Sequence, residues 1–373
     1  GVACGAAGAG GEKRIGVFPE AAFQIAGTVV AFDHLKKTLR VIVNAAVLPG
    51  GEGADEAYDR AVGKIKRVLE RLEDPGSSGI PRLAPRITEG EDGNVLFGVE
   101  SNMERERFLE IVARAREYVK AGDIFQVVLS QRFQRRIRAD SFSLYRALRA
   151  TNPSPYMYFL DFGDFTVVGS SPEVMVRLEE GKITLRPIAG TRRRGRTPEE
   201  DEGLERELLG DEKERAEHIM LVDLGRNDVG RVAEKGSVVV DELMTIERYS
   251  HVMHIVSNVT GRLERGRTAC DVIRSAFPAG TVSGAPKIRA MEIISELEPD
   301  RRGPYAGAAG YIGFDGNADT AIVLRTILVS DGVAAVQAGA GIVYDSVPER
   351  EFEETVNKAA GMLRAIEWAE RGL

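Results

Sequence analysis

Two pairs of glutamates have the type and the spacing to do chemistry. Glu214 and Glu217 lie three residues apart in DEKERAEHIMLVDL, and Glu351 and Glu354 have the same spacing in PEREFEETVNKAA. Residues three apart share a face of an α-helix, so each pair can direct two carboxylates at one point. Four carboxylates converging from two helices would form an oxygen-rich site of the kind that Mg²⁺ occupies. One pair alone is better explained as a solvated helix face.

A single arginine, Arg325, interrupts the apolar run TAIVLRTILVS. Alternation places it on one face of a predicted strand, beside Val323 and Ile327. A guanidinium in such a run is costly to bury without an anion. The sequence therefore predicts either a structural carboxylate partner or an anionic ligand bound at two points, and it leaves both open.

Two glycine-rich segments could bring the backbone close to a ligand. The first, PAGTVSGAPKIRAMEII, enters a predicted helix whose first N–H groups could hold a carboxylate. It differs from the phosphate-binding pattern of nucleotide-binding loops. The second, QAGAGIVYDS, lacks the side chains that would keep a ligand at a distance. Either segment alone is better explained as a tight turn.

The composition is that of an ordinary globular protein and excludes several classes. Of the 373 residues, 43% are hydrophobic and 29% are charged, which is too apolar for a disordered chain. The formal net charge of −7 does not favour nucleic acid or an anionic membrane. The arginines at 192–194 are followed by a run of acidic residues, which indicates a solvated, self-neutralising face. No apolar run is long enough to cross a bilayer.

The cysteine content indicates a reducing compartment. Cys4 and Cys270 are too few for a disulfide framework, and neither has a Cys or His neighbour at metal-ligand spacing. We therefore expect a cytoplasmic protein.

The predicted helices and strands that position these residues follow one another in groups. Strand-like runs come mostly as hairpins with helices between the groups, which favours an α+β fold with antiparallel sheets. Residues 28–47 predict two strands around a turn, and residues 74–94, rich in Pro, Gly, Ser and charge, predict a linker. The chain is thereby divided into residues 1–94 and 95–373. Helical periodicity predicts helices at 53–73, 108–119, 199–221, 267–276, 286–297 and 349–367.

A series of motifs follows one another along residues 100–368. They run in the order GDIFQVVLSQRF, NPSPYMYFL, VGSSPE, RPIAGTRRRG, DEKERAEHIMLVDLGRNDVGRV, YSHVMH, FPAGTVSGAPK, YAGAAGYIGF, AIVLRT and QAGAGIVYDSVPEREFEETVNKA. In this order they resemble the chorismate-utilising enzymes, and within them the anthranilate synthase component I family. The resemblance implies a four-layer αββα sandwich of largely antiparallel sheets, with residues 95–373 as the catalytic domain.

The resemblance also implies a cofactor, a substrate and roles for named residues. The cofactor is Mg²⁺, with Glu217 and Glu354 as its ligands and with Glu214 and Glu351 acting mainly through metal-bound water. The substrate is chorismate, and Glu173 corresponds to the general acid that protonates its departing C4 hydroxyl. The remaining site residues are His254 near the leaving pyruvate, Thr191 and Gly190 along the ring, Arg325 and Tyr305 at the enolpyruvyl carboxylate, and Gly339, Gly341 and Lys358 in a carboxylate-binding wall.

Two positions favour one activity within this family. Relatives that form isochorismate or salicylate carry a lysine base where this chain has Gln126, and aminodeoxychorismate synthases carry a lysine nucleophile where it has Ala189. Glutamine is not a base, and alanine leaves space for ammonia beside C2 of chorismate. The resemblance thus implies anthranilate synthesis. An aminodeoxychorismate or isochorismate synthase and a non-catalytic chorismate-binding subunit are the alternatives.

The resemblance further implies partners and a regulatory ligand. Ammonia would come from a glutamine amidotransferase subunit, component II, or from free ammonium. Full-length relatives carry a Leu-Leu-Glu-Ser stretch that is not found here, so we expect a shortened N-terminal region, with residues 1–94 as its remnant and linker. One side of a tryptophan feedback pocket is present at Asn152, Pro153, Ser154, Pro155, Tyr156 and Met157.

Overall fold

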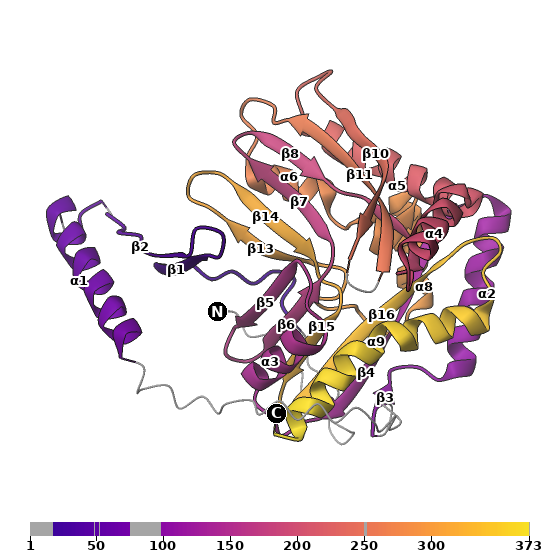
Figure 1. Ribbon diagram of the computed structural model, residues 1–373, viewed down its shortest axis with the longest axis horizontal. Coiled ribbons are helices and arrows are strands. Elements are labelled where there is room, and N and C mark those ends of the chain that lie inside the picture. The colour runs from indigo at the N-terminus through magenta and orange to yellow at the C-terminus, as the bar shows by residue number, and fades with distance from the viewer. Residues whose placement is uncertain (1–17, 48, 52, 75–97, 250–251, 373) are drawn as a thin grey trace. The chain divides into compact units, whose positions relative to one another are not determined.

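A computed structural model describes the chain except for residues 1–17, 48, 52, 75–97, 250–251 and 373 (Figure 1). The chain forms two compact units, one of Ala21–Pro85 and one of Gly1–Glu20 together with Arg86–Leu373. The predicted boundary after residue 94, and the predicted linker beyond Asp74, lie outside the described residues. That boundary stays a prediction.

The smaller unit is a hairpin followed by a helix. Strands β1 (Thr28–Asp33) and β2 (Thr38–Val43) pair antiparallel, and α1 spans Ala54–Glu73. The Asp33 carboxylate closes the turn by accepting from the N–H groups of Leu35 and Lys36 at 3.1 and 2.9 Å. The predicted strands and helix are confirmed here.

The larger unit contains two antiparallel sheets, which we name after one residue of each. The His254 sheet has the order β10 (Val239–Arg248), β11 (Val252–Arg262), β8 (Lys182–Leu185), β7 (Val174–Glu179), β14 (Ala318–Ile322) and β13 (Ala308–Ile312), with β9 (Ile188–Arg193) also paired to β11. The Gln126 sheet has the order β12 (Gly284–Ala285), β4 (Gln126–Arg136), β16 (Val333–Ile342), β15 (Thr326–Ser330), β6 (Thr166–Ser171) and β5 (Tyr156–Asp161), with β3 (Glu100–Ser101) also paired to β4.

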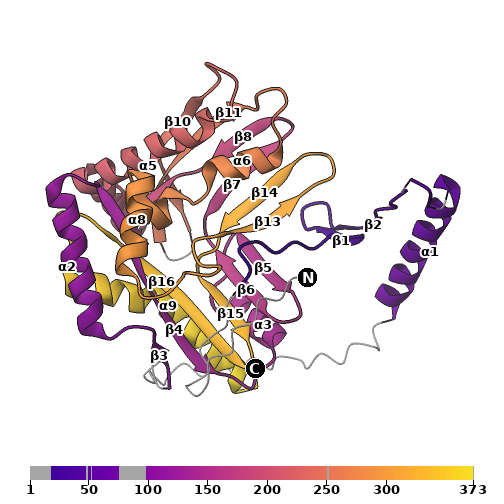
Figure 2. The ribbon, with the colours of Figure 1, turned by 180° about the vertical axis from the view of Figure 1, so that it is seen from behind.

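Each sheet is covered by its own helices (Figures 1 and 2). The His254 sheet packs its apolar side chains against α5 (Glu212–Gly230) and α6 (Ala269–Ala276), with α4 (Pro198–Gly210) beside β9. The Gln126 sheet packs against α2 (Arg105–Ala121), α3 (Ser141–Thr151), α8 (Lys287–Leu297) and α9 (Pro348–Glu370). This succession of helix, sheet, sheet and helix confirms the predicted four-layer α+β fold.

Strand β4 shows how alternation divides the core from the site. Val127, Leu129 and Phe133 are buried against the helices. Gln126 and Ser130 belong to the opposite face and bond to Glu217 and Glu298. Successive side chains of a strand point to opposite faces, so one strand supplies both the core and the polar residues.

One predicted helix proved to be two. The sequence predicts a single helix over 199–221, whereas α4 ends at Gly210 and α5 begins at Glu212. Asp211 lies between them and its carboxylate accepts from the N–H groups of Lys213 and Glu214 at 3.0 and 3.2 Å. This cap starts a new helix, so the positions of the glutamates on α5 depend on where Asp211 begins that helix and not on α4.

The chain also contains a helix that the periodicity did not predict. Helix α3 follows β4, and the carboxylate of Asp140 accepts from the N–H of Ser143 at its start. Leu144, Ala147 and Leu148 are its buried residues. Among the described residues, no helix is long and apolar enough to span a membrane.

Replacing Phe108 by alanine is expected to lower the free energy of unfolding by about 3–5 kcal/mol, because a fully buried ring leaves a cavity. Phe108 meets Phe352 edge to face at a centroid distance of 5.8 Å and so ties α2 to α9. Urea unfolding measures the change. Phe314→Ala, at an 82% exposed ring, is the matched control and should change stability by less than about 0.5 kcal/mol. Equal losses in both variants would contradict this packing.

Candidate active site

The two glutamate pairs occupy α5 and α9, as predicted. Glu217 accepts a hydrogen bond from Gln126 Nε2 at 2.8 Å, which joins α5 to β4. Burial raises the pKa of Glu217 above its usual range; the Gln126 hydrogen bond opposes this, and the negative charges of Glu214 and Glu354 add to it. The two helices therefore bring their carboxylates close enough to repel one another.

The carboxylates of α9 have their own neighbours. Glu354 forms an ion pair with Lys358 at 2.6 Å, one helical turn away. Burial raises the pKa of Glu351, the Ser346 hydroxyl opposes this, and the charge of Glu354 adds to it. Within the described residues, no three His, Cys, Asp or Glu side chains stand together as a ready metal site. The donor set is nevertheless all oxygen and carries excess negative charge around Glu217, which suits a hard cation such as Mg²⁺.

The arginine cluster is not wholly remote from this site. Arg192 donates to Glu214 at 3.2 Å, to Asp211 at 2.9 Å and to Glu207 at 2.9 Å. The prediction of a solvated, self-neutralising stretch holds for Arg193 and Arg194, which pair with Glu200 and Asp201. Arg192 is likewise neutralised by Glu207 of the acidic run, but it is not a fully solvated residue, because folding places β9 beside the start of α5 and brings this guanidinium onto Glu214, a predicted site carboxylate.

A β-bulge in β9 sets the histidine in place. His254 pairs with Thr191 and Ile255 pairs with Ala189, so Gly190 is the extra residue, and its φ is +69°. Glycine adopts that backbone conformation without steric cost. The bulge turns the Gly190 carbonyl toward His254 Nδ1, 3.1 Å away, and the Thr191 hydroxyl lies 3.0 Å from the same nitrogen.

These contacts fix the tautomer of His254. A carbonyl oxygen can only accept, so Nδ1 carries the proton, and Nε2 has no hydrogen-bond partner among the described residues. Burial lowers the pKa of His254 below its usual range; the Gly190 carbonyl opposes this and the positive charge of Arg325 adds to it. The imidazole is thus neutral at physiological pH and presents a free lone pair.

Glu173, at the turn between β6 and β7, has the environment of a general acid. Its residue is only 9% exposed, and burial raises the pKa of its carboxyl to about 8, against the opposing effects of Thr281, Lys358 and Arg325. A carboxyl with such a pKa is protonated at neutral pH and can donate its proton. This fits the role that the resemblance implied.

Arg325 lies at a crossover between the sheets and not within one strand. Strand β14 ends at Ile322 in the His254 sheet and β15 begins at Thr326 in the Gln126 sheet. Arg325 has a φ of +46° at this bend, which the continuous apolar run did not reveal. The predicted strand through Val323, Arg325 and Ile327 was therefore wrong. The guanidinium is exposed and makes no hydrogen bond or ion pair within the part of the chain that the structure describes.

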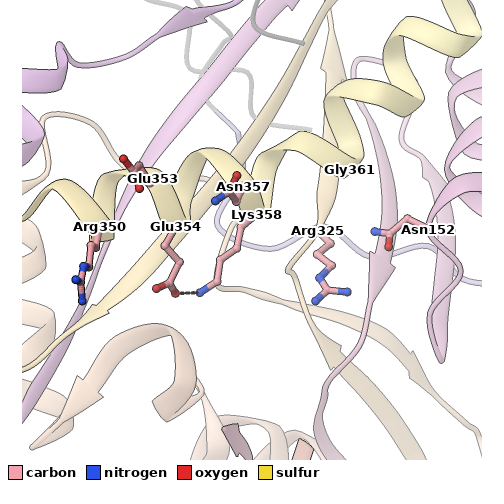
Figure 3. A pocket seen from close by; sticks show the side chains of 8 residues that line it. All are labelled: Asn152, Arg325, Arg350, Glu353, Glu354, Asn357, Lys358 and Gly361. Carbon is pink, nitrogen blue, oxygen red and sulfur yellow. Dashed lines mark ion pairs between the residues drawn. The ribbon is translucent and has the colours of Figure 1, made fainter. Parts of the chain in front are cut away.

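A cleft of about 500 Å³ opens beside Arg325. In Figure 3, Glu354, Lys358 and Arg325 point to the same side, whereas Glu353 points to the other side of α9. The lining residues are Asn152, Arg325, Arg350, Glu353, Glu354, Asn357, Lys358 and Gly361. Lys358 and the unpaired Arg325 make the cleft suited to a carboxylate.

The remaining predicted residues, Gly339, Gly341, Tyr305 and Lys358, lie close together, and the two glycines have no room for a side chain. A Cβ on Gly339 would lie 2.7 Å from the Tyr305 hydroxyl and 2.9 Å from the Leu129 carbonyl, and one on Gly341 would lie 2.6 Å from Gln126 Nε2. Lys358 donates to the Gly339 carbonyl at 3.0 Å. Burial raises the pKa of Tyr305 to about 12, so its hydroxyl stays protonated and can donate.

Gly339→Ala is expected to raise the KM for substrate at least about tenfold, because the added methyl meets a backbone oxygen that cannot move aside. Steady-state kinetics measure the change. The matched control is Gly203→Ala in α4, where nothing lies within 4 Å of the added carbon. An unchanged KM in Gly339→Ala would remove this wall from the substrate site.

Sequence reasoning missed Arg192, Thr281, Arg302 and Glu298. Thr281 lies in the helical turn α7 (Gly280–Ser283), within the glycine-rich segment that the sequence alone explained better as a tight turn than as a carboxylate site. Arg302 and Glu298 form an ion pair at 2.6 Å. Their spacing of four residues was a weak signal, since such pairs are common on solvated helices.

Comparisons with known proteins identify the family of this chain. The model of the chorismate binding enzyme family matches residues 7–364. Anthranilate synthase component 1 of Aquifex aeolicus is 55% identical over 92% of this chain and 67% of its own length, and that of Acetivibrio thermocellus is 53% identical over 94% and 70%.

Solved structures show the same fold. Anthranilate synthase component I from Streptococcus pneumoniae superimposes with a TM-score of 0.77 at 45% identity, covering 91% of this chain and 72% of its own. The menaquinone-specific isochorismate synthase from Escherichia coli gives 0.66 at 25% identity, covering 72% and 62%. The chain therefore belongs to the chorismate-binding enzyme family, and within it to the anthranilate synthase component 1 group.

Proposed function

We propose that this chain is an anthranilate synthase, a lyase that aminates chorismate at C2 and eliminates pyruvate, in the first step of tryptophan biosynthesis. The observation that carries the proposal is the guanidinium of Arg325, which makes no hydrogen bond or ion pair among the described residues and lines a cleft together with Lys358. The positive charges of both residues act on the buried acid Glu173. Chorismate carries two carboxylates and a hydroxyl that must leave. Arg325 and Lys358 supply positive charge for the carboxylates, and Glu173 supplies a proton for the departing hydroxyl.

The binding groups act together to orient the substrate. Arg325 and the Tyr305 hydroxyl hold the enolpyruvyl carboxylate. Lys358 and the backbone at Gly339 and Gly341 form the second carboxylate-binding wall, where the absence of side chains permits close approach. Holding both carboxylates places the ring between Glu173 and the Gly190–Thr191 bulge.

In the first step, ammonia forms a bond to C2 and the C4 hydroxyl departs. Glu173 gives its proton to that oxygen, so the leaving group is water rather than hydroxide. Ammonia needs no base once it is neutral, which fits Gln126 in place of a lysine. Ala189 leaves room for ammonia and cannot itself attack C2.

In the second step, the proton on C2 is lost and the C3–O bond breaks, which releases pyruvate and leaves the aromatic ring of anthranilate. His254 has an unprotonated Nε2 that can take a proton, and its orientation is held by Gly190 and Thr191. It therefore acts at the side of the departing pyruvate.

Mg²⁺ fits the carboxylates that α5 and α9 supply. Glu217 and Glu354 would hold it directly, and Glu214 and Glu351 would act through bound water. When bound, the ion supplies positive charge against the ring carboxylate and helps to orient the substrate. Lys358 would then leave its ion pair with Glu354 and bind a substrate carboxylate instead.

The decisive experiment is incubation of the protein with chorismate, Mg²⁺ and ammonium at mildly alkaline pH, followed by anthranilate fluorescence and product chromatography. We expect anthranilate and pyruvate in equal amounts. Aminodeoxychorismate or isochorismate as the product would overturn the interpretation of Ala189 and Gln126. Bound chorismate without turnover would indicate a non-catalytic subunit instead.

Two further partners follow from the proposal. A glutamine amidotransferase subunit would supply ammonia in the cytoplasm, where this chain is proposed to act, because relatives bear the name component 1. Tryptophan is proposed as a feedback ligand at the stretch from Asn152 to Met157, where Asn152 ends α3 and Tyr156 donates to Asp319 at 2.9 Å. Inhibition of anthranilate formation by added tryptophan tests the second of these.

A further inference from the structure

Arg302 is a partly buried arginine, 15% exposed at its side chain, that the mechanism does not use. It lies between α8 and β13, and its Nε and Nη2 donate to the two carboxylate oxygens of Glu298 at 2.9 and 2.6 Å. The Glu298 side chain is 4% exposed. Charges removed from water in this way need hydrogen bonds on all sides to keep their place.

The other hydrogen bonds of this pair reach backbone around the site. Arg302 donates from Nη1 to the Val282 carbonyl and from Nη2 to the Val128 carbonyl, each at 2.6 Å. Glu298 accepts from both the N–H and the hydroxyl of Ser130 at 2.8 Å. The pair thus joins β4 to α7, where Val282 directly follows the Thr281 that lies beside Glu173.

Arg302 also lies over the ring of Tyr305, 5.5 Å from its centroid. A guanidinium at that distance attracts the face of the ring and restricts its orientation. The Tyr305 hydroxyl lies against Gly339 and makes no hydrogen bond with another described residue. It is therefore held in place from behind while its donor stays free for a ligand.

We propose that Arg302, braced by Glu298, is a positioning residue for the Tyr305 hydroxyl and through it for a substrate carboxylate. The inference rests on the proposed function, which puts a carboxylate of chorismate at Tyr305. Preorganisation of a donor lowers the ordering cost of binding, so its loss weakens binding even when the donor itself remains.

The test is a double-mutant cycle on chorismate binding. Arg302→Gln and Tyr305→Phe are each expected to raise the calorimetric Kd and the KM about tenfold. The double variant should be no weaker than the weaker single variant, because both changes remove one interaction. Arg302→Lys keeps a cation near the ring but lacks the two-point pair, so it should recover only part of the affinity. Additive effects in the double variant would overturn the inference.

Arg132→Gln is the matched control. Arg132 lies on β4, donates to Asp300 at 3.2 Å and has a 12% exposed side chain, so it resembles Arg302 in burial and in having a carboxylate partner. It lies outside the contacts of Tyr305. We expect its loss to lower the melting temperature and to leave the Kd for chorismate unchanged. The same pattern in Arg302→Gln would show a merely structural role and overturn the inference.

A second variant keeps the test decisive if Arg302→Gln does not fold. Glu298→Gln leaves the guanidinium in place but removes its charge partner. Like Arg302→Gln, it should raise the Kd for chorismate. An unchanged Kd in that variant overturns the inference. Failure of the proposed function has a different signature: the unaltered protein would then form no anthranilate, either because it does not bind chorismate or because it binds chorismate without turnover.

Discussion

Glu173→Gln is expected to reduce kcat/KM for anthranilate formation about 10²–10⁴-fold, the range that a positioned general acid contributes. Glutamine has nearly the same shape as the protonated acid and still donates a hydrogen bond, so the KM for chorismate should change little. Stopped or continuous anthranilate assays measure the loss. A variant that keeps more than a tenth of the activity would remove Glu173 from the acid role.

The pH dependence of the same pair of proteins is a second readout. Because burial raises the pKa of Glu173 to about 8, the unaltered protein should lose kcat/KM as the pH rises through about 8, where the acid gives up its proton. The glutamine variant should lack this limb. An identical alkaline limb in both proteins would assign it to another group.

The raised pKa also predicts the direction of a stability change. The folded protein holds the Glu173 proton more tightly than the unfolded chain, whose carboxyl titrates near its usual value of about 4.5. Stability is therefore lost as the pH rises from about 4.5 to about 8. The melting temperature of the unaltered protein should fall more between pH 6 and 9 than that of Glu173→Gln.

Glu354→Gln is expected to abolish Mg²⁺-dependent turnover, with a loss of at least about 100-fold in kcat/KM, because a neutral amide is a weak ligand for a hard cation. Titration of Mg²⁺ by calorimetry, without substrate, should show weaker binding in the same variant. This measurement does not depend on activity and separates the metal role from a general effect on catalysis.

Glu353→Gln is the matched control for Glu354. It is the adjacent residue on α9, it is exposed, and its side chain points to the other side of the helix in Figure 3. It should keep both turnover and Mg²⁺ affinity. Equal effects of the two substitutions would attribute the loss to the charge of α9 as a whole, and unchanged behaviour of Glu354→Gln would remove it from the metal site.

Prediction from the sequence was most successful where the physics is local. The spacing of Glu214 and Glu217, and of Glu351 and Glu354, follows from the pitch of one helix. Strand alternation likewise explains why Gln126 and Ser130 lie on the face of β4 opposite the core residues. Such patterns depend on residues within a turn or two of one another.

Contacts between distant segments were not predictable in this way. The run through Arg325 reads as one strand, yet a single residue with φ of +46° sends the chain from one sheet to the other. Arg192 reads as part of a solvated cluster, yet the pairing of β9 with β11 brings it to Glu214. Neither outcome has a local signature.

The sequence by itself determined the chemical inventory of this protein: two carboxylate pairs, an arginine in an apolar run, the glycines at 339 and 341, and the uncharged residues Gln126 and Ala189. Only the tertiary structure decided how that inventory is used. It left Arg325 without a hydrogen bond or ion pair among the described residues, buried Glu173 so that its acid form persists, and placed Arg302 against the ring of Tyr305. The reason is physical: burial and long-range pairing fix pKa values and orientations, and both arise only when sheets and helices pack.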